Sequence, residues 1–388
     1  MKINSRRIEE FLERGVSEIV KKESLKKKLE SGARLRIKHG VDPTTKDLHL
    51  GHSAVYLKMR DLQEMGHKII FLIGDFTGRF GDPTQKLVAR QLRPKKEVRD
   101  MAKNYLRQAG KIIDLKKAEV RHNSEWYDKM SLEDLLKLMS KFTIHRMLER
   151  DMFQKRIEQK KEIRFQEPVY PLLQGYDSVV LKADVAICGN DQLFNEIKGR
   201  ELQEEFDQEP QDVIAMKMLV GLDGKEKMSQ SLGNDIKIED PPEEQYGKIM
   251  SIPDILIKEY FELATRVPLK DVEKGSPRDL KAQLARTIVE MYHGKSQAEK
   301  AEDNFNKVFR DRQNPENIPE VRVSEKKLPL LDLLMKTGLV SSKSEAKRLI
   351  EQKGVKINKK TQDDWDKEVE TKKGMVIQVG KRRFVRII

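Results

Sequence analysis

The sequence predicts an α/β protein whose first 235 residues fold around a parallel β-sheet. Residues Ile69 to Ile73 form a continuous apolar run, which is typical of a strand buried on both faces. The glycine-rich segment Gly74 to Gly78 follows this run directly. A helical apolar pattern precedes it, and an earlier short strand spans Leu35 to Ile37. Strand, helix, strand and glycine-rich turn together indicate one half of a nucleotide-binding sheet, whose ligands bind at its carboxyl edge.

The segment between the two strands carries start and stop signals for its helix. The first strand ends at Gly40, and His49-Leu50-Gly51-His52 opens the helix. Gly66 closes it. One face of the helix is apolar at helical spacing through Val55, Met59 and Leu62. The two histidines are therefore expected at a helix N-terminus, where anions bind readily.

Two further regions are predicted to be helical. Residues 120–165 form an insertion in which apolar residues recur at helical spacing: Leu132, Leu135, Leu136 and Met139. This insertion is a candidate dimer surface, although the same pattern also fits ordinary core packing. Residues 242–312 are predicted to be all-helical, with an apolar stripe made of Leu280, Leu284, Ile288 and Met291.

Composition excludes several classes of protein. The chain has 388 residues, 36% of them charged, and its longest plain apolar run, Ile69 to Ile73, is far too short to span a bilayer. The N-terminus has early acidic residues and no apolar secretory segment. Cys188 is the single cysteine, which excludes an internal disulfide and a multi-cysteine metal site. We therefore expect a cytoplasmic protein of two or three domains with no membrane partner.

Much of the positive charge is concentrated at the C-terminus. Residues 325–388 hold 17 lysines and arginines against 9 acidic residues, so they carry +8 of the total net charge of +13. This module follows a linker, residues 313–324, which contains Pro315 and Pro319. Basic runs are often only a solvated face, but their concentration in one small unit favours an RNA partner.

Two motifs far apart in the sequence carry the chemistry. His49 and His52, separated by Leu-Gly, can both point at one phosphate oxyanion. The loop Lys227-Met228-Ser229-Gln230-Ser231 can close over the same group with a cation and two hydroxyls. Together they fit a nucleoside triphosphate whose α-phosphorus is attacked and whose pyrophosphate leaves. An isolated H-x-G-H proves little, so the pairing of the motifs carries the argument.

These motifs, with others in the same order along nearly the whole chain, resemble the bacterial tyrosyl-tRNA synthetases, which are class I aminoacyl-tRNA synthetases. The other matching segments are Val41-Asp42-Pro43-Thr44, Gly74 to Pro83, Tyr170-Pro171-Leu172-Leu173-Gln174-Gly175-Tyr176-Asp177 and Gly189-Asn190-Asp191-Gln192. The C-terminal module is similar to a small RNA-binding fold shared with a ribosomal protein, through Ser341 to Ala346, Gly354 to Asn358 and Val379 to Phe384.

The resemblance implies an organisation for the whole chain. It implies a Rossmann-like catalytic domain over residues 1–235, with the helical insertion at about 120–165. A helical anticodon-region domain would follow over residues 236–312, then the linker, then a small α+β RNA-binding domain over residues 325–388. It also implies that two copies of the chain form a homodimer.

The resemblance further implies the reaction. Tyrosine would be activated by ATP to tyrosyl-adenylate and pyrophosphate, and then transferred to the 3′-terminal adenosine of tRNA(Tyr). Mg²⁺ would accompany ATP rather than occupy a metal site of the protein. Residues expected to act on the triphosphate are Thr44, His49, His52, Lys86, Arg90 and Lys227. Residues expected to hold ATP are Gly51, Gly189, Asp191, Leu219, Val220, Ser229 and Ser231. The expected RNA contacts are Lys343, Lys347, Arg348, Lys381, Arg382 and Arg383.

The resemblance also implies a pocket for tyrosine. Its expected members are Lys38, Asp82, Tyr170, Gln174, Asp177 and Gln192. Asp82, Tyr170 and Gln174 would bind the ammonium group, and Gln192 would lie near the carboxylate. Asp177 would accept the phenolic hydroxyl. Lys38 stands where many members of the family have a tyrosine near the phenol, so recognition would depend more on Asp177.

Each of these residues, taken alone, has a simpler explanation. His52 could cap a helix, and Asp177 could be a helix-start carboxylate satisfied by the helix dipole. Tyr170 could be plain core, Asp82 a turn residue and Lys227 part of a solvated loop. The coincidence of all five in family order favours the functional interpretation.

Three functions remain under consideration. The first is a tyrosine–tRNA ligase. The second is its sister enzyme for tryptophan, or a nucleotidyltransferase with the same histidine motif; Asp177 favours a phenol over an indole, and the basic module argues against a small-molecule cytidylyltransferase. The third is an RNA-binding protein with a decayed active site. Gln230, which stands where a second lysine is usual, supports that third reading, whereas His49, His52 and Lys227 argue against it.

Overall fold

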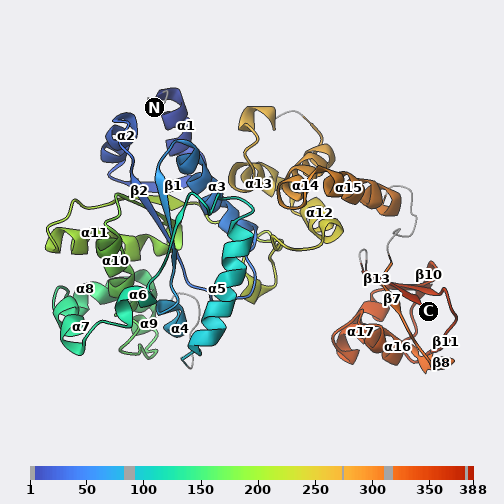
Figure 1. The fold of residues 1–388 in the computed structure, drawn as a ribbon. Coiled ribbons are helices and arrows are strands. Elements are labelled where there is room, and N and C mark those ends of the chain that lie inside the picture. The colour runs from blue at the N-terminus through green and yellow to red at the C-terminus, as the bar shows by residue number, and fades with distance from the viewer. Residues whose placement is uncertain (1–4, 83–91, 273–274, 310–317, 381–382) are drawn as a thin grey trace. The chain divides into compact units, whose positions relative to one another are not determined.

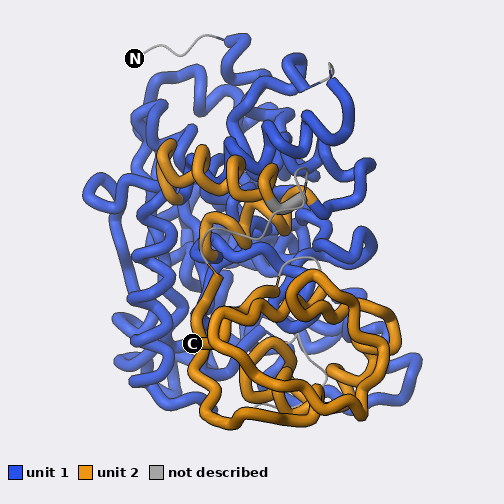
Figure 2. Tube along the Cα trace, turned by 90° about the vertical axis from the view of Figure 1, so that its right-hand side faces the viewer, with its two compact units in different colours: residues 1–240, 251–292 blue, residues 241–250, 293–388 orange. Residues whose placement is uncertain are grey.

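The computed structural model describes residues 5–82, 92–272, 275–309, 318–380 and 383–388. The chain forms two compact units: residues 1–240 with 251–292, and residues 241–250 with 293–388. Figure 2 distinguishes the two units by colour. The predicted domain boundaries near residues 235, 312 and 324 remain predictions. No helix in the described part of the chain is long and apolar enough to cross a membrane.

The first unit is built on a six-stranded sheet with the order β1-β6-β5-β2-β3-β4 (Figure 1). Its strands are β1 (Val16–Val20), β2 (Arg36–Val41), β3 (Lys68–Ile73), β4 (Glu119–His122), β5 (Val185–Gly189) and β6 (Asp212–Met216). All neighbouring strands are parallel except β1 and β6, which are antiparallel. The chain extends the sheet from β2 to β3 and β4 on one side, and adds β5 and β6 on the other. The predicted parallel-sheet α/β fold is confirmed, and its switch point lies between β2 and β5.

Outside the insertion, seven described α-helices of the first unit precede or connect these strands. They are α1 (Ser5–Glu13), α2 (Lys22–Glu30), α3 (Leu50–Glu64), α4 (Thr77–Phe80), α5 (Lys95–Ala109), α10 (Tyr170–Leu181) and α11 (Leu193–Glu205). Helices α2, α3, α10 and α11 among them contact the sheet. Helix α3 contacts β3 and β5, and α11 contacts β5 and β6. The predicted apolar face of α3 is buried, as is nearly all of β3 from Ile69 onwards. This burial on both faces explains why β3 is a continuous apolar run.

The two regions predicted to be helical are mainly helical in their described parts, but residues 120–122 belong to strand β4 and residues 159–165 are not helical. The insertion forms α6 (Ser124–Tyr127), α7 (Leu132–Met139), α8 (Ile144–Leu148) and α9 (Asp151–Glu158). The later region forms α12 (Pro242–Met250), α13 (Ile257–Ala264), α14 (Pro277–His293) and α15 (Lys295–Phe309). Helices α12 and α15 pack together within the second unit, whereas α13 and nearly all of α14 belong to the first.

The C-terminal part of the second unit is a small α+β fold, as expected. Its helices are α16 (Leu330–Lys336) and α17 (Lys343–Glu351). Its strands are β7 (Glu320–Val321), β8 (Lys327–Pro329), β9 (Val355–Ile357), β10 (Lys360–Gln362), β11 (Glu368–Glu370), β12 (Val376–Val379) and β13 (Arg383–Ile387). The sheet order is β10-β9-β12-β13-β7, and β8 pairs separately with β11. One apolar cluster, running from Leu330 to Ile387 and contributed by both helices and the sheet, forms its core.

Candidate active site

A cavity of about 630 Å³ lies at the carboxyl end of the parallel strands. Its wall includes Asp42 after β2, Gly74 after β3 and Lys217 after β6. Most residues that the sequence predicts for the site line this cavity: Thr44, His49, Gly51, His52, Asp82, Tyr170, Gln174, Asp177, Gly189, Asp191, Gln192, Leu219, Lys227, Ser229 and Ser231. The structure therefore gathers residues from both sides of the switch point around one space.

Four predicted site residues are not placed there. Lys86 and Arg90 lie outside the described residues. Lys38 and Val220 are described, but neither lines the cavity. The N–H of Val220 donates to Glu259 Oε1 (3.0 Å), and its carbonyl accepts the hydroxyl of Tyr260 (2.8 Å). Both backbone groups of Val220 are therefore bonded to other parts of the protein.

The first motif is built into the start of α3. His49 is the residue before the helix, and its Nδ1 atom accepts the N–H of Gly51 (3.2 Å). A Cβ atom on residue 51 would lie 2.9 Å from this ring, so the close approach requires glycine. The N–H of His49 in turn donates to His52 Nδ1 (3.2 Å). The two histidines thus cap the helix reciprocally, in the manner of a capping box.

A ring nitrogen that accepts a hydrogen bond is unprotonated, so in His49 the proton is on Nε2. His52 Nδ1 lies 3.2 Å from both the N–H and the carbonyl oxygen of His49, and the tautomer that completes the reciprocal cap carries its proton on Nε2. Burial lowers the pKa of His49 well below its usual value and lowers the pKa of His52 to about 4, so both rings are neutral at pH 7. They are neutral N–H donors at the positive end of α3, which suits an anion. The capping interpretation of His52 and the functional one are therefore compatible.

Asp177 lies about two turns inside α10, so it is not the helix-start carboxylate considered from the sequence. Its side chain is buried, and Trp126 Nε1 donates to its Oδ1 (3.0 Å). Asn123 Nδ2 lies 3.5 Å from its Oδ2. Burial raises the pKa of Asp177 to about 7, and the charge of Lys38 acts in the opposite direction. A buried carboxylate that faces the cavity is equipped to accept a hydrogen bond from a ligand hydroxyl.

Asp42 is a site residue to which the sequence assigned no role. Its Oδ1 accepts the hydroxyl of Thr77 (2.7 Å) and its Oδ2 accepts the hydroxyl of Tyr170 (2.8 Å). Burial raises the pKa of Asp42 to about 7. A Cβ atom on residue 74 would lie 1.9 Å from Asp42 Oδ1, so Gly74 makes room for this carboxylate. The position of Asp42 directly after a strand was the one signal in the sequence that could have identified it.

Arg150 was also missed, because its segment was interpreted only as dimer surface or core. It is buried at the start of α9, and its Nη1 lies 3.5 Å from Asp82 Oδ1. Its Nη2 donates to the carbonyl of Asp191 (3.2 Å). Gln192 Nε2 donates to the other oxygen of Asp82 (2.5 Å). Arg150 therefore links the residue expected to bind the ammonium group to the one expected to bind ribose.

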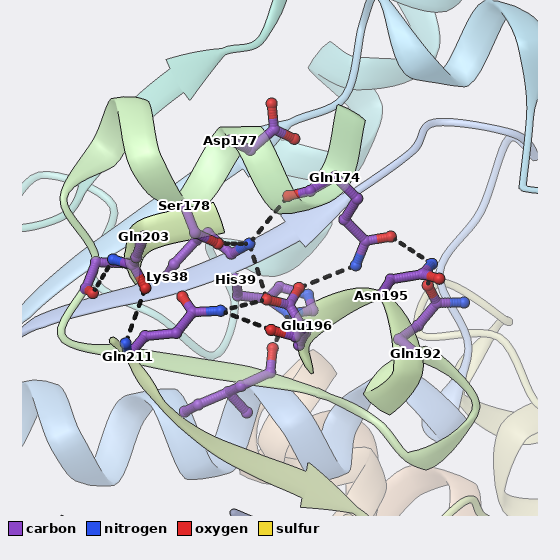
Figure 3. A network of polar contacts seen from close by, with 12 residues as sticks. Lys38, His39, Gln174, Asp177, Ser178, Gln192, Asn195, Glu196, Gln203 and Gln211 are labelled. Carbon is purple, nitrogen blue, oxygen red and sulfur yellow. Dashed lines mark hydrogen bonds and ion pairs between the residues drawn. The ribbon is translucent and has the colours of Figure 1, made fainter. Parts of the chain in front are cut away.

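A chain of amide side chains runs along one wall of the cavity (Figure 3). Gln174 Nε2 donates to Glu196 Oε1 (2.9 Å), and Asn195 Nδ2 donates to Gln174 Oε1 (2.7 Å) and to Gln192 Oε1 (2.9 Å). Lys38 Nζ lies 2.9 Å from Glu196 Oε2. Lys38 is thus buried behind this wall and bonded to protein groups, in contrast to its expected place in the tyrosine pocket.

The second motif folds over the cavity. Lys227 Nζ forms an ion pair with Asp191 Oδ2 (2.9 Å). The hydroxyls of Ser229 and Ser231 are 3.0 Å apart. Gln230 Nε2 donates to the carbonyl of Asp47 (2.5 Å), two residues before the first histidine. The loop is therefore tied to the same segment that positions the histidines.

The basic residues expected to contact RNA belong to the second unit. Lys343 pairs with Asp332 (2.6 Å), and Lys347 Nζ lies 3.9 Å from the centre of the Trp365 ring. Arg348 is exposed. Arg383 opens β13 instead of lying on the turn, and it donates to Leu339 O (2.6 Å) and to Glu345 (2.9 Å), so it braces the start of α17. Lys381 and Arg382 lie outside the described residues.

Comparison with known proteins gives consistent matches. Residues 29–310 match the family model described as tRNA synthetases class I (W and Y), and residues 312–387 match that of the tyrosine–tRNA ligase SYY-like C-terminal domain. The tyrosine–tRNA ligase of Thermotoga maritima is 46% identical over 386 residues, which cover 97% of this chain and 96% of that protein. That of Geobacter metallireducens is 47% identical and covers 97% of this chain and 98% of its own.

Solved structures share the fold. The tyrosyl-tRNA synthetase from Archaeoglobus fulgidus, complexed with L-tyrosine, has a TM-score of 0.62 and is 23% identical, covering 77% of this chain and 100% of its own. A C-terminally truncated mitochondrial tyrosyl-tRNA synthetase from Aspergillus nidulans has a TM-score of 0.64 and is 22% identical. The match covers 79% of this chain and 94% of that one.

Proposed function

The chain belongs to the class I tRNA synthetases of the tryptophan and tyrosine group, and from this premise we propose how its cavity performs the tyrosine–tRNA ligase reaction. ATP is a substrate of this reaction, in which tyrosine is joined to tRNA. The observation that carries the proposal is one cavity that holds two neutral histidine donors at a helix N-terminus and a buried carboxylate, Asp177.

Activation requires little proton transfer. A carboxylate oxygen of tyrosine attacks the α-phosphorus of ATP, the bond to the pyrophosphate oxygen breaks, and pyrophosphate leaves. The nucleophile is already an anion, so the protein needs no general base and acts by positioning and charge stabilisation. The Nε2–H groups of His49 and His52 donate to phosphate oxygens. Lys227 leaves Asp191 to bind the departing pyrophosphate, which frees Asp191 for the ribose hydroxyls.

Tyrosine lies with its phenol at Asp177 and its amino-acid end at the other end of the cavity. Asp82, Gln174 and the hydroxyl of Tyr170 accept hydrogen bonds from the ammonium group. Gln192 donates to the carboxylate and so holds it towards the phosphorus. The ion pair of Arg150 with Asp82 limits the excess of negative charge at the ammonium site.

The partners follow from charge and exposed apolar surface. The basic module at residues 325–388 binds the phosphates of tRNA(Tyr). Exposed apolar side chains of the insertion, Leu132 and Phe165 among them, surround a cavity of about 880 Å³ and form the face through which two chains make a homodimer. Mg²⁺ enters with the phosphates of ATP. A buried, unpaired cysteine fits the reducing cytoplasm as the place of action.

The test is amino-acid-dependent exchange of pyrophosphate into ATP, measured with each of the twenty amino acids. Tyrosine should support exchange at the highest ratio of kcat to KM. In the same assay, replacing Gln174 by Ala should raise the KM for tyrosine far more than the KM for ATP. Equal effects of Gln174→Ala on both substrates would overturn the assignment of the ammonium site.

A further inference from the structure

A buried ion pair lies at the wall of the tyrosine pocket: Glu196 is among the residues that line the cavity, and Lys38 is not. The side chains of Lys38 and Glu196 are 1% and 3% exposed, and the cation lies 2.9 Å from Glu196 Oε2. Lys38 also donates to the hydroxyl of Ser178 (2.6 Å), and Gln211 Nε2 donates to the same carboxylate (3.0 Å). Charges this far from water persist only when they are paired and hydrogen-bonded.

The carboxylate of Glu196 dictates the direction of the amide groups around it. An ionised carboxylate only accepts hydrogen bonds, so Gln174 must turn its NH₂ group towards Glu196. The Gln174 oxygen then faces Asn195, which must donate. The side-chain oxygens of Asn195 and Gln211 are buried with no hydrogen-bond partner among the described residues. Both amides keep this direction although it leaves their oxygens unsatisfied. A reversed Gln211 amide would set its oxygen against the Glu196 carboxylate, and a reversed Asn195 amide would set its oxygen against that of Gln174.

We propose that the Lys38–Glu196 pair is a positioning device for recognition of the substrate's α-ammonium group. It rests on the assignment above of Gln174 to that group. With its NH₂ held by Glu196, Gln174 presents its oxygen, which has a second lone pair for the ammonium group. A reversed amide would present N–H donors to a cation. Glu196 lines the cavity and acts on the ammonium group by fixing the direction of the Gln174 amide, and Lys38 acts by pairing with Glu196. The charge of Lys38 also acts on Asp177, at the phenol end.

The test uses the variant Glu196→Gln, which keeps the shape and removes the charge. Lys38 is the stronger donor, so it takes the oxygen of the new glutamine and leaves the new NH₂ group facing Gln174. The amide of Gln174 must then reverse. Tyrosinol keeps the ammonium group but lacks the carboxylate, and 3-(4-hydroxyphenyl)propionate keeps the carboxylate but lacks the ammonium group. We expect the inhibition constant of tyrosinol in ATP–pyrophosphate exchange to rise roughly tenfold, and that of the propionate to change less than about twofold.

The double variant Lys38→Met with Glu196→Gln separates positioning from simple structural damage. Without the cation, the oxygen of the introduced glutamine side chain is free to face Gln174, and Gln211 can turn its unsatisfied oxygen towards the new NH₂ group. Tyrosinol affinity should therefore recover to within about threefold of the parent chain. The KM for tyrosine should follow tyrosinol in both variants, while kcat changes less. Any change at the phenol end affects tyrosinol and the propionate alike. The ratio of their inhibition constants therefore reports the change at the ammonium group.

Two controls complete the experiment. Glu201→Gln makes the same change on the same helix, α11, at an ion pair with Lys198 that does not touch the amide chain. The ratio of the tyrosinol and propionate inhibition constants should therefore stay unchanged. Gln174→Ala tests the underlying assignment: unchanged tyrosinol affinity there would refute the ammonium site itself. If Gln174→Ala weakens tyrosinol but Glu196→Gln does not, or if the double variant is no better than the single one while both are folded, the positioning role is wrong.

Discussion

At the scale of single residues, we infer that the two neutral histidines donate hydrogen bonds that strengthen during the reaction. The hydrogen bond that such an N–H donates becomes stronger as negative charge accumulates on the leaving phosphates. We predict that His52→Ala lowers the rate of adenylate formation by about 10²–10³-fold, with little loss of ground-state affinity for ATP or tyrosine. Single-turnover kinetics and equilibrium binding on the same preparation measure the two effects.

His52 also accepts the N–H of His49, so its removal affects the helix start. His52→Gln is the matched control, because glutamine at this third position of a helix can make the same reciprocal bond. It should keep the thermal stability that His52→Ala loses. An equal loss of ground-state ATP affinity and rate in His52→Ala would contradict the transition-state role.

Asp177 is the residue to which we assign the choice of tyrosine. Phenylalanine would leave its buried carboxylate without the hydrogen of a phenol, and an unsatisfied buried charge is costly. We predict that Asp177→Asn reduces the preference for tyrosine over phenylalanine, measured as a ratio of kcat/KM values, by roughly 10²-fold or more. The amide keeps the volume of the side chain, so stability should change less than selectivity. Full discrimination in the variant would show that another group reads the phenol.

Asp42 gives a prediction about pH and stability. Burial raises its pKa from 3.8 to about 7, so the folded chain binds more protons than the unfolded chain between these values. Its contribution to the free energy of unfolding is therefore fully present below pH 3.8 and is lost as the pH rises towards 7. Asp42→Asn removes this titration. The stability of the variant relative to the parent should improve by about 2 kcal/mol between pH 5 and pH 8, measured by urea unfolding. A difference that is independent of pH would refute the buried titration.

The residues that could be predicted from the sequence belong to motifs that can be recognised from neighbouring residues alone. Histidines at a helix start and a lysine–serine loop are visible without a structure. The partners of these residues are not, because they are set by tertiary contacts. Asp42 meets Tyr170 from 128 positions away, and Lys38 meets Glu196 from another layer of the fold. The resemblance placed Lys38 in the tyrosine pocket, whereas its ammonium group is buried against Glu196 and Ser178.

At the scale of elements, strands and helices with strong periodicity could be predicted, but their long-range pairing could not. The start of α3 and the apolar strand β3 lie where the sequence indicates. The antiparallel edge formed by β1 and β6 has no such signal, since its pairing joins residues about 200 positions apart. The same is true of the contacts that join Leu48 and Leu50 to Ile236 and Ile238, just beyond the second motif. These contacts hold the loop and the helix start in register.

Gln230 connects those two elements and yields the next prediction. Its side chain ties the loop to the carbonyl of Asp47, which a lysine could also do while adding a cation near the phosphates. We expect Gln230→Lys to leave the rate of activation unchanged or to raise it, and Gln230→Ala, which removes the donor, to lower it several-fold. The rate of ATP–pyrophosphate exchange at saturating tyrosine distinguishes these outcomes. A large fall with lysine would mean that the loop requires a neutral side chain at this position.

At the scale of the whole molecule, we predict that activation and tRNA charging depend on different parts of the chain. Every described residue that lines the cavity belongs to the first unit, and the apolar core from Leu330 to Ile387 is complete without it. Strand β7 pairs with β13, so a clean truncation removes residues 318–388, which carry a net charge of +8. Tyrosine activation should then stay nearly intact, because no proposed catalytic residue is lost.

Charging of tRNA should collapse in the same truncated chain. Fewer phosphate contacts release fewer counterions, so the remaining tRNA affinity should also depend less steeply on salt concentration. A full-length double variant, Lys347→Ala with Arg348→Ala, is a milder change. It should weaken tRNA binding and reduce the salt dependence of that binding without altering activation. If the module served only stability or dimer formation, truncation would lower activation and charging alike. The two rates, measured on one preparation, therefore decide between an RNA-binding module and a structural one.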